Sequence, residues 1–438
     1  MNRQILRLAI PNILSNLTVP LLSSVDTALV GRLDDTHFLG AVAVGSAMFS
    51  FIYWGFGFLR MGTTGLTAQA FGEKNQPEMS LILARALVVA GISALLLMAV
   101  QVPAAKLSFY LIDASTDVEH FASRYFYIRM TAAPATLALF VLNGWFLGMQ
   151  NAKFPLYLSV FVNLTNIVFS VIFVRFFAMN SDGVALGTVC AQYLSLIAGL
   201  FLLFRGYQPD WRSVTRSAIF KSDTFRRYLQ INRDIFIRTI CLVFALAYFT
   251  AQSAEFGDDL LAVNTILMQL LLILAYGTDG FAFAAESLIG KFIGERNRKS
   301  LREVIRLSFF WSMGLGAITS CFYYIFYRDL IFIFTDKTHL TDLAMPFIGW
   351  VAIAPLINGF SYIWDGIFIG ATDGKALRKA MLICTFIFYL PVYWLFRDVL
   401  GNHALWLAMT IFMLARGVSL WIYAKFRMRI WLSTAGDN

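Results

Sequence analysis

Long apolar stretches separated by short polar segments make up almost the whole chain. A helix needs about twenty apolar residues to cross the hydrocarbon core of a bilayer. Twelve stretches of roughly that length can be marked, at 5–31, 38–59, 80–101, 122–149, 154–176, 183–204, 228–251, 260–286, 304–326, 343–370, 377–396 and 404–424. Because backbone groups in lipid must find their hydrogen bonds internally, the pattern predicts an all-α membrane protein with twelve transmembrane helices.

Composition supports a membrane location and argues against a soluble or nucleic-acid-binding protein. Hydrophobic residues make up 59% of the chain and charged residues 14%, against roughly 25% charged in an average soluble domain. The net charge is +9, but no basic helix or aromatic-interleaved basic patch is present to bind nucleic acid. We therefore expect the lipid bilayer as the main partner, and the oligomeric state stays open.

Lys and Arg are distributed unevenly between the loops on the two sides of the predicted membrane. We count basic residues within a few positions of a span end with the adjoining loop, since span ends are uncertain by a few residues. With both termini in the cytoplasm, the inside segments then hold 24 of the 35 basic residues and the outside loops hold 7. The remaining four lie deeper within spans and are Arg129, Arg233, Arg238 and Arg416. Cytoplasmic loops carry an excess of Lys and Arg, so this split predicts cytoplasmic termini and an even number of helices.

The two halves of the chain repeat each other. The segment Phe71-Gly-Glu-Lys-Asn75 corresponds to Ile293-Gly-Glu-Arg-Asn297, and Asn143-Gly144 corresponds to Asp365-Gly366, both at an offset of 222. Each repeat has six spans, so both halves enter the membrane in the same orientation, with a pseudo-twofold axis along the membrane normal. This arrangement predicts a transporter with a cavity between two bundles.

The repeat also predicts the domain boundaries. A polar segment with six basic residues separates the sixth and seventh spans, and we interpret it as a connector, with an amphipathic helix on the membrane surface as one form that it could take. The predicted parts are an N-terminal six-helix bundle, a cytoplasmic connector and a C-terminal six-helix bundle, at 1–204, 205–227 and 228–438.

Asp26 is the strongest candidate for transport chemistry because charged side chains at membrane depth are costly and are usually functional. No Lys or Arg lies three or four residues from it on the helix, so it lacks a local counter-ion. It could bind and release a proton or a cation; the alternative is an ion pair with another helix. Pro11 and Pro20 precede it, and each invites a helix bend, although a static kink is an equal alternative.

Polar residues recur on one face of the fifth span. Asn163 and Asn166 are three residues apart and Ser170 follows four residues later, so the three share a helix face. Thr188 lies in the sixth span. Such a face in lipid either bonds to a neighbouring helix or lines a wet cavity, and the sequence leaves both open.

The second half offers two further acids at membrane depth. Asp365 occupies the repeat position of Asn143, and Asp279 lies in the eighth span. Either one is a candidate for a second cation or substrate site.

No enzyme or cofactor motif accompanies these residues. The chain has no Walker A lysine motif, no H-E-x-x-H and no glycine-rich dinucleotide motif, and its four cysteines form no C-x-x-C pair. We therefore expect no catalytic residues, no cofactor and no dedicated metal site, apart from a sodium ion at Asp26 as an alternative to a proton.

The motifs as a set resemble the multidrug and toxic compound extrusion (MATE) family, and its DinF-like branch most of all. The resemblance is carried by Val25-Asp26-Thr27-Ala28-Leu29-Val30-Gly31, Leu39-Gly-Ala-Val-Ala-Val-Gly45, Leu59-Arg-Met-Gly-Thr-Thr-Gly-Leu-Thr-Ala-Gln-Ala-Phe-Gly72 and Trp364-Asp365-Gly366. It covers essentially the whole chain. It implies two six-helix bundles around a central cavity, in the inner (plasma) membrane of a bacterium.

The resemblance also implies site residues. Family members of this kind carry an acid on the first helix, which Asp26 matches, and a proline bend, which Pro11 matches by spacing. They also carry an asparagine on helix five and a threonine on helix six, which Asn166 and Thr188 match. Ser170 departs, because the family pattern often has an aspartate there. With one carboxylate in place of two, a sodium site is weakened, so proton coupling is expected.

The function implied is multidrug efflux, a secondary antiport that exports small amphipathic, mostly cationic compounds in exchange for H⁺ or Na⁺. One alternative is a flippase of lipid-linked precursors from the same broad superfamily, although such proteins often carry extra helices and basic cavities. The other is a membrane-embedded enzyme, which would need a cluster of acids, bases or metal ligands on facing spans. No such cluster is visible in the sequence.

Overall fold

The chain folds almost entirely into helices that group into two compact units. The computed structural model describes residues 1–31, 36–112 and 116–433, and among these it contains no strand. A few side chains within the described helices, including those of Pro20 and Asp26, lie outside the described part. One compact unit comprises Leu14–Tyr228, and the other comprises Met1–Ile13 and Leu229–Asn438.

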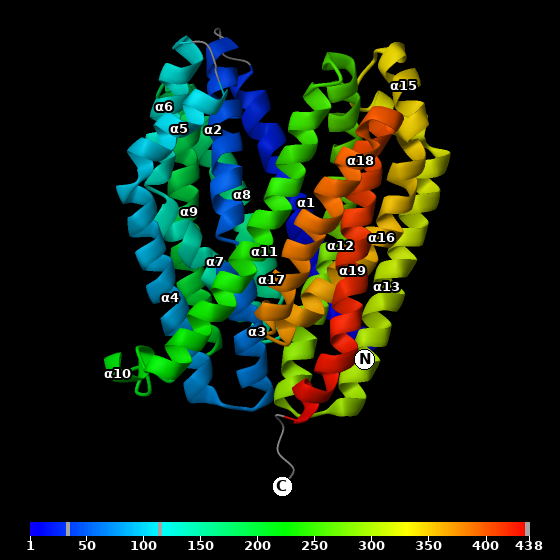
Figure 1. The fold of residues 1–438 in the computed structure, drawn as a ribbon. Coiled ribbons are helices and arrows are strands. Elements are labelled where there is room, and N and C mark those ends of the chain that lie inside the picture. Colours follow the sequence, from blue (N-terminus) through cyan, green and yellow to red (C-terminus); the bar gives the residue numbers. More distant parts are fainter. Residues whose placement is uncertain (32–35, 113–115, 434–438) are drawn as a thin grey trace. The chain divides into compact units, whose positions relative to one another are not determined.

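The unit formed by Leu14–Tyr228 contains the helices of the first half, apart from the start of α1, together with the first residues of α11 (Ser222–Ala254) (Figure 1). They are α1 (Asn2–Val30), α2 (Thr36–Gly55), α3 (Phe58–Gly72), α4 (Gln76–Ala99), α5 (Gln101–Ile112), α6 (Thr116–Met130), α7 (Ala133–Gly148), α8 (Lys153–Val171), the π-helical turn η1 (Ile172–Phe176), α9 (Ser181–Gly206) and the short α10 (Arg216–Ile219).

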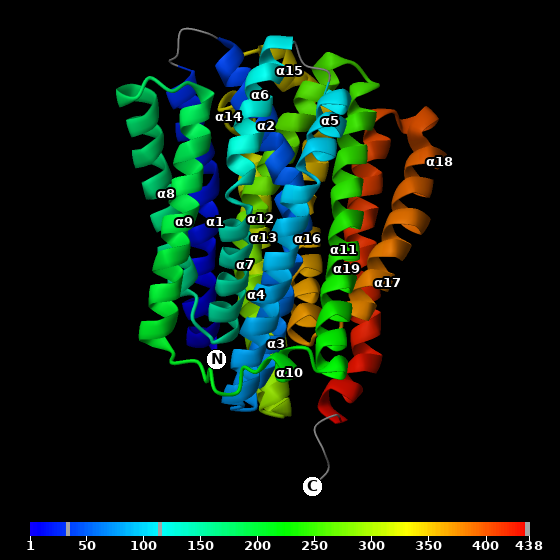
Figure 2. The same cartoon turned by 90° about the vertical axis from the view of Figure 1, so that its left-hand side faces the viewer.

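The second unit contains the helices of the second half (Figure 2). They are α11 (Ser222–Ala254), α12 (Asp258–Gly294), α13 (Arg298–Ile325), α14 (Tyr327–Phe332), α15 (Thr338–Ala344), the 3-10 turn η2 (Met345–Phe347), α16 (Ile348–Gly370), α17 (Gly374–Ile383), the π-helical segment η3 (Cys384–Tyr389), α18 (Leu390–Leu400) and α19 (Asn402–Ser433).

Each of the twelve predicted spans coincides with one helix or with consecutive helical segments. Ten helices in the described residues are long and apolar enough to cross a membrane, and α6 and α7 together form an eleventh that bends by 53°. The helix α1, with 29 residues, covers the remaining predicted stretch. The prediction of an all-α membrane protein is confirmed. The sequence pattern did not separate α2 from α3, and it did not predict α5 beyond the end of α4.

The internal repeat appears as a pair of matching turns. Lys74 and Arg296 both adopt the left-handed conformation, with φ of 56° and 58°. The next residue in each case, Asn75 or Asn297, caps the following helix by accepting a hydrogen bond from the backbone N–H three residues on, at 3.1 and 3.0 Å. Asparagine is a favoured N-cap because its side-chain oxygen satisfies an orphan N–H of the first turn.

Matching glycines bring the helices of each half into close contact. A Cβ at Gly144 would collide with the carbonyl of Arg60, so α7 lies directly on α3. A Cβ at Gly366 would collide in the same way with the carbonyl of Ala282, so α16 lies on α12. Small residues at helix contacts are how membrane helices pack without a hydrophobic driving force. The offset of 222 therefore marks a structural repeat.

The compact units differ from the predicted bundles at the N-terminus. The first thirteen residues of the chain group with the second half, whereas the predicted boundary assigned them to 1–204. Gly280 of α12 lies so close to Ala9 and Ile13 that a Cβ there would meet their backbone atoms at 2.9 and 3.1 Å. The start of α1 therefore packs on α12.

Candidate functional site

Three of the predicted polar residues come together between α8 and α9. The Asn166 side-chain amide donates to the Thr188 hydroxyl at 2.8 Å, and Ser170 lies 3.5 Å from the Asn166 carbonyl oxygen. All three residues are buried. Gly187 lets Ser170 approach α9, because a Cβ at Gly187 would lie 2.6 Å from the Ser170 hydroxyl oxygen. We call these three residues the Asn166 cluster.

The same helix α8 also bonds to α1. Asn163 donates to the Thr18 carbonyl at 3.1 Å, and the Ser159 hydroxyl donates to the Ser15 carbonyl at 3.4 Å. The Thr18 and Ser159 hydroxyls lie 2.9 Å apart. Asn163 therefore joins α8 to α1, while Asn166 joins α8 to α9. The predicted polar face of α8 makes interhelical hydrogen bonds on both sides.

The predicted proline bends and the predicted acid all lie on α1. This helix is continuous from Asn2 to Val30, through Pro11 and Pro20. The side chains of Asp26 and Pro20 lie outside the described residues. The roles of Asp26 and of the two prolines stay predictions.

Asn143 lies on a different helix from the residues of the Asn166 cluster. It lies on α7, one residue before the glycine that packs on α3, and it is half-buried. Its side-chain oxygen is buried without a hydrogen-bond partner among the described residues. Since a buried acceptor left unpaired is destabilising, this position is suited to a bound water or a polar ligand group.

Asp365 does not stand alone in the second half. Its carboxylate forms ion pairs with Arg238 of α11 and with Arg416 of α19. Arg416 is completely buried, and its Nε donates to Asp365 Oδ1 at 3.1 Å. We call Arg238, Asp365 and Arg416 the charge triad. It differs from the cation site predicted at Asp365, because two guanidiniums already occupy the oxygens that a cation would bind.

Asp279 of α12 belongs to the surroundings of this triad. It lies close enough to both Arg238 and Arg416 for electrostatic interaction, and Glu286 lies within the same range of Arg238. The Arg416 guanidinium also lies 5.6 Å from the centre of the Tyr362 ring, a cation–π distance. Each guanidinium of the charge triad therefore interacts electrostatically with carboxylates from α12 and α16.

The family follows from comparison with known proteins. The MatE family model matches residues 11–172 and 235–395, one segment in each half of the chain. DNA damage-inducible protein F of Escherichia coli (strain K12) is 39% identical over 423 residues, covering 94% of this chain and 90% of that protein. The chain belongs to the MATE family.

More distant MATE proteins and solved structures agree with this assignment. The probable multidrug resistance protein NorM of Photorhabdus laumondii is 22% identical over 449 residues and is covered to 96%. A crystal structure of MATE in the bent conformation superimposes with a TM-score of 0.89 at 18% identity, covering 99% of this chain and 96% of that one. An outward-facing multidrug resistance MATE transporter gives a TM-score of 0.85. At such identities the solved structures establish the shared fold.

MATE membership makes this chain a multi-pass membrane protein of a multidrug efflux family. It supports the expectation of a non-enzymatic protein, and it supports an inner-membrane location through the bacterial relatives. These relatives do not favour the flippase alternative. The orientation of the termini and the coupling ion stay predictions.

The partners of Asp365 were not identified from the sequence. Arg238 and Arg416 were both recognisable as basic residues inside predicted spans. An intramembrane Arg is expected to pair with an intramembrane acid, so the signal was present. What the sequence could not supply was which of the acids each arginine meets.

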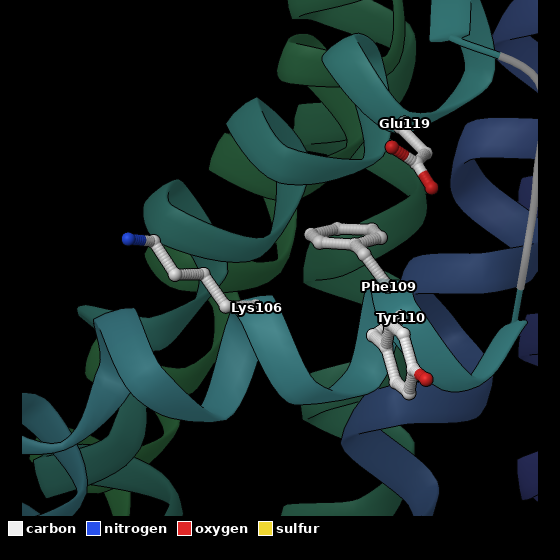
Figure 3. A pocket seen from close by; sticks show the side chains of 4 residues that line it. All are labelled: Lys106, Phe109, Tyr110 and Glu119. Atoms are coloured by element: carbon white, nitrogen blue, oxygen red, sulfur yellow. The ribbon is translucent and has the colours of Figure 1, made fainter.

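A surface hollow on this MATE protein lies apart from the polar clusters. It is lined by Lys106, Phe109 and Tyr110 of α5 and Glu119 of α6, and Figure 3 shows Lys106 extending away from the other three side chains. These residues follow the end of α4 at the ends of spans, so the hollow contains none of the predicted transport residues.

Proposed function

We propose that this MATE protein exports small amphipathic cations in exchange for protons, with Asp26 as the group that exchanges its counter-ion. In the inward-facing state the Asp26 carboxylate attracts the cationic substrate or releases its proton. Protonation from outside then neutralises the carboxylate and weakens substrate binding. The observation that carries the proposal is the polar face of α8, which bonds to α1 and to α9.

The register between α1 and α8 supports this assignment. Ser159 bonds to Ser15 at a sequence offset of 144, and Asn163 bonds to Thr18 at an offset of 145. The two helices therefore run in parallel with a nearly constant offset. Extrapolated by two helical turns, the offset of 144 pairs position 26 with position 170. This extrapolation supports the Asn166 cluster as the proposed partner of Asp26.

The uncharged nature of the Asn166 cluster favours a proton over sodium. Sodium, a hard cation, prefers oxygen ligands, and an added carboxylate raises the affinity of such a site. The cluster supplies one amide and two hydroxyls, with Ser170 at the position where the family pattern often has an aspartate. A single carboxyl group at membrane depth is suited to binding a proton, because a low-dielectric environment disfavours its charged form.

The charge triad of the second half also favours Asp26 over Asp365 as the acid that exchanges a proton. Asp365 is paired with two arginines, and Asp279 lies within electrostatic range of both. A carboxylate held by a guanidinium stays ionised, so it is poorly suited to exchanging a proton. The first helix carries the acid without a local basic neighbour.

The energetics of one proton suffice for concentrative export. Moving one charge down 100 mV releases about 2.3 kcal/mol, and each pH unit adds about 1.4 kcal/mol. Together these support roughly two to three decades of substrate concentration per proton.

The test is efflux from proteoliposomes that contain the purified full-length protein, under separately imposed proton and sodium gradients. Asp26→Asn is expected to abolish efflux driven by a pH gradient. The matched control is Asp117→Asn, because Asp117 is a 74% exposed acid on α6. Undiminished pH-driven efflux by Asp26→Asn would remove Asp26 from the mechanism, and efflux driven by sodium alone would contradict proton coupling.

A further inference from the structure

The lipid-facing side of α9 ends in an unusual cap of aromatic and basic side chains. Phe201 and Phe204 are 59% and 54% exposed on this apolar span, so they face the lipid tails. At the end of the same stripe the Arg205 guanidinium lies 5.8 Å from the Phe201 ring centre. Trp211 packs on Phe204 with ring centres 5.9 Å apart.

The position of Trp211 fixes the depth of this cap. Its neighbour Phe204 is in the last turn of α9, where the apolar stretch gives way to Arg205 and the connector. Trp is enriched at the boundary between lipid tails and headgroups, because its ring is amphipathic. Trp211, itself 43% exposed, therefore belongs at headgroup level, with Arg205 beside it.

The connector adds positive charge at the same level. Residues 205–227 contain six basic side chains and two acidic ones, which leaves a net charge of +4. All six basic side chains are exposed, and they are Arg205, Arg212, Arg216, Lys221, Arg226 and Arg227. An exposed basic set beside a headgroup-level tryptophan is complementary to a negatively charged lipid surface.

The connector is held rigidly against the end of the bundle. The buried Arg85 of α4 donates to the carbonyls of Ala218 and Ile219 in α10, at 3.0 and 3.2 Å, and to Glu78 at 2.7 Å. The Asp210 backbone N–H donates to Ser80 at 2.9 Å. Figure 1 shows α10 to the side of the lower end of α4. The basic side chains are therefore presented at a fixed height.

We propose that Arg205, Trp211 and Arg212, with the other basic side chains of the connector, form a binding surface for the headgroups of anionic phospholipids. The phosphate of the headgroup lies among the guanidiniums while its acyl chains run along Phe201 and Phe204. The negative headgroup selects phosphatidylglycerol-type lipids over zwitterionic ones. The surface depends on the membrane position of α9 and not on which ion or drug the transporter carries.

The experiment measures lipid binding to the purified full-length protein. Native mass spectrometry counts the phosphatidylglycerol and phosphatidylcholine molecules retained when both are supplied in equal amounts. The wild type is expected to retain phosphatidylglycerol preferentially. The Arg205→Gln/Arg212→Gln variant is expected to lose about fivefold in preference for each basic side chain removed. Thermal unfolding in phosphatidylcholine checks that the variant is folded.

The matched control removes two exposed basic side chains elsewhere, in Lys106→Gln/Arg328→Gln. Lys106 lies beyond the last turn of α4, and Arg328 lies beyond the last turn of α13. Both therefore lie at the opposite ends of these helices from the first turns, which Asn75 and Asn297 cap. This variant is expected to keep the wild-type preference. Equal losses in both variants, or no loss in the connector variant, would overturn the proposal. The proposal would also be overturned if millimolar inorganic phosphate competed for the surface as well as phosphatidylglycerol does, because the surface would then be a free-anion site.

Discussion

Arg416 and Asp365 form a hydrogen-bonded ion pair between α19 and α16, with the Arg416 Nε 3.1 Å from the Asp365 Oδ1 and no part of Arg416 exposed. Arg238 of α11 binds the same carboxylate. Three helices are therefore joined through one acid at membrane depth. Breaking a buried pair on one side leaves an uncompensated charge, which costs about 3–5 kcal/mol.

The charge triad predicts a strong asymmetry between its acid and its bases. Asp365→Asn leaves the buried Arg238 and Arg416 guanidiniums without the carboxylate that they share, so it is expected to destabilise the protein by about 3–5 kcal/mol. Arg416→Gln leaves the Arg238–Asp365 ion pair in place, so it is expected to cost less. Thermal unfolding of the detergent-purified variants measures this. Equal losses of stability in the two variants would contradict this account of the triad.

Ser170 predicts a gain of sodium response. Ser170→Asp would put a carboxylate beside Asn166, whose side-chain oxygen is 3.5 Å from the Ser170 hydroxyl. A second carboxylate near the level of Asp26 is expected to raise sodium affinity by at least tenfold. Efflux under an imposed sodium gradient, compared with Ser170→Asn as an uncharged control of the same shape, tests this. Equal sodium-driven efflux by both variants would mean that the charge has no effect there.

Gly187 predicts that the packing of α9 on α8 sets the geometry of the Asn166 cluster. A Cβ at Gly187 would lie 2.6 Å from the Ser170 hydroxyl and 2.8 Å from its backbone nitrogen. Gly187→Ala is therefore expected to destabilise the protein by about 1–3 kcal/mol and to reduce efflux. The control is Gly91→Ala, where a Cβ would meet nothing within 4 Å. Equal decreases in the thermal unfolding midpoints of Gly187→Ala and Gly91→Ala would contradict this account.

Arg85 is expected to make a major contribution to holding the connector, alongside the hydrogen bond from Asp210 to Ser80. Arg85→Ala removes both hydrogen bonds to the last carbonyls of α10, so trypsin is expected to cut within 205–227 at least tenfold faster than in the wild type. Arg85→Lys, which has the charge but not the fork of donors, is expected to fall between the two. Unchanged cleavage in Arg85→Ala would show that other contacts suffice.

The sequence predicted the helices well because the membrane imposes a simple rule. A stretch of about twenty apolar residues must be helical in lipid, and so every predicted span coincides with helical structure. Breaks within spans were harder to predict. The α2–α3 junction lies at Phe56 and Gly57, and the bend of 53° between α6 and α7 lies just before Pro134, in the first turn of α7. Hydropathy alone does not show either break.

The polar sites were predicted unequally, for a physical reason. Asn166, Ser170 and Thr188 were found because they share a helix face or a neighbouring span, and spacing along one helix is visible in the sequence. The pairing of Asp365 with Arg238 and Arg416 spans 127 and 51 residues. Such a pairing depends on which helix faces meet, so no local pattern reveals it.

The contact of Gly280 with Ala9 and Ile13 has a consequence for biosynthesis. The opening segment of the chain packs on a helix that is translated about 270 residues later. At about 5–20 residues per second, that partner emerges roughly 13–54 seconds after the segment itself. During this interval the newly made segment depends on the insertion machinery or on lipid for protection. A nascent chain arrested at residue 228 would therefore expose the start of α1 to proteolysis.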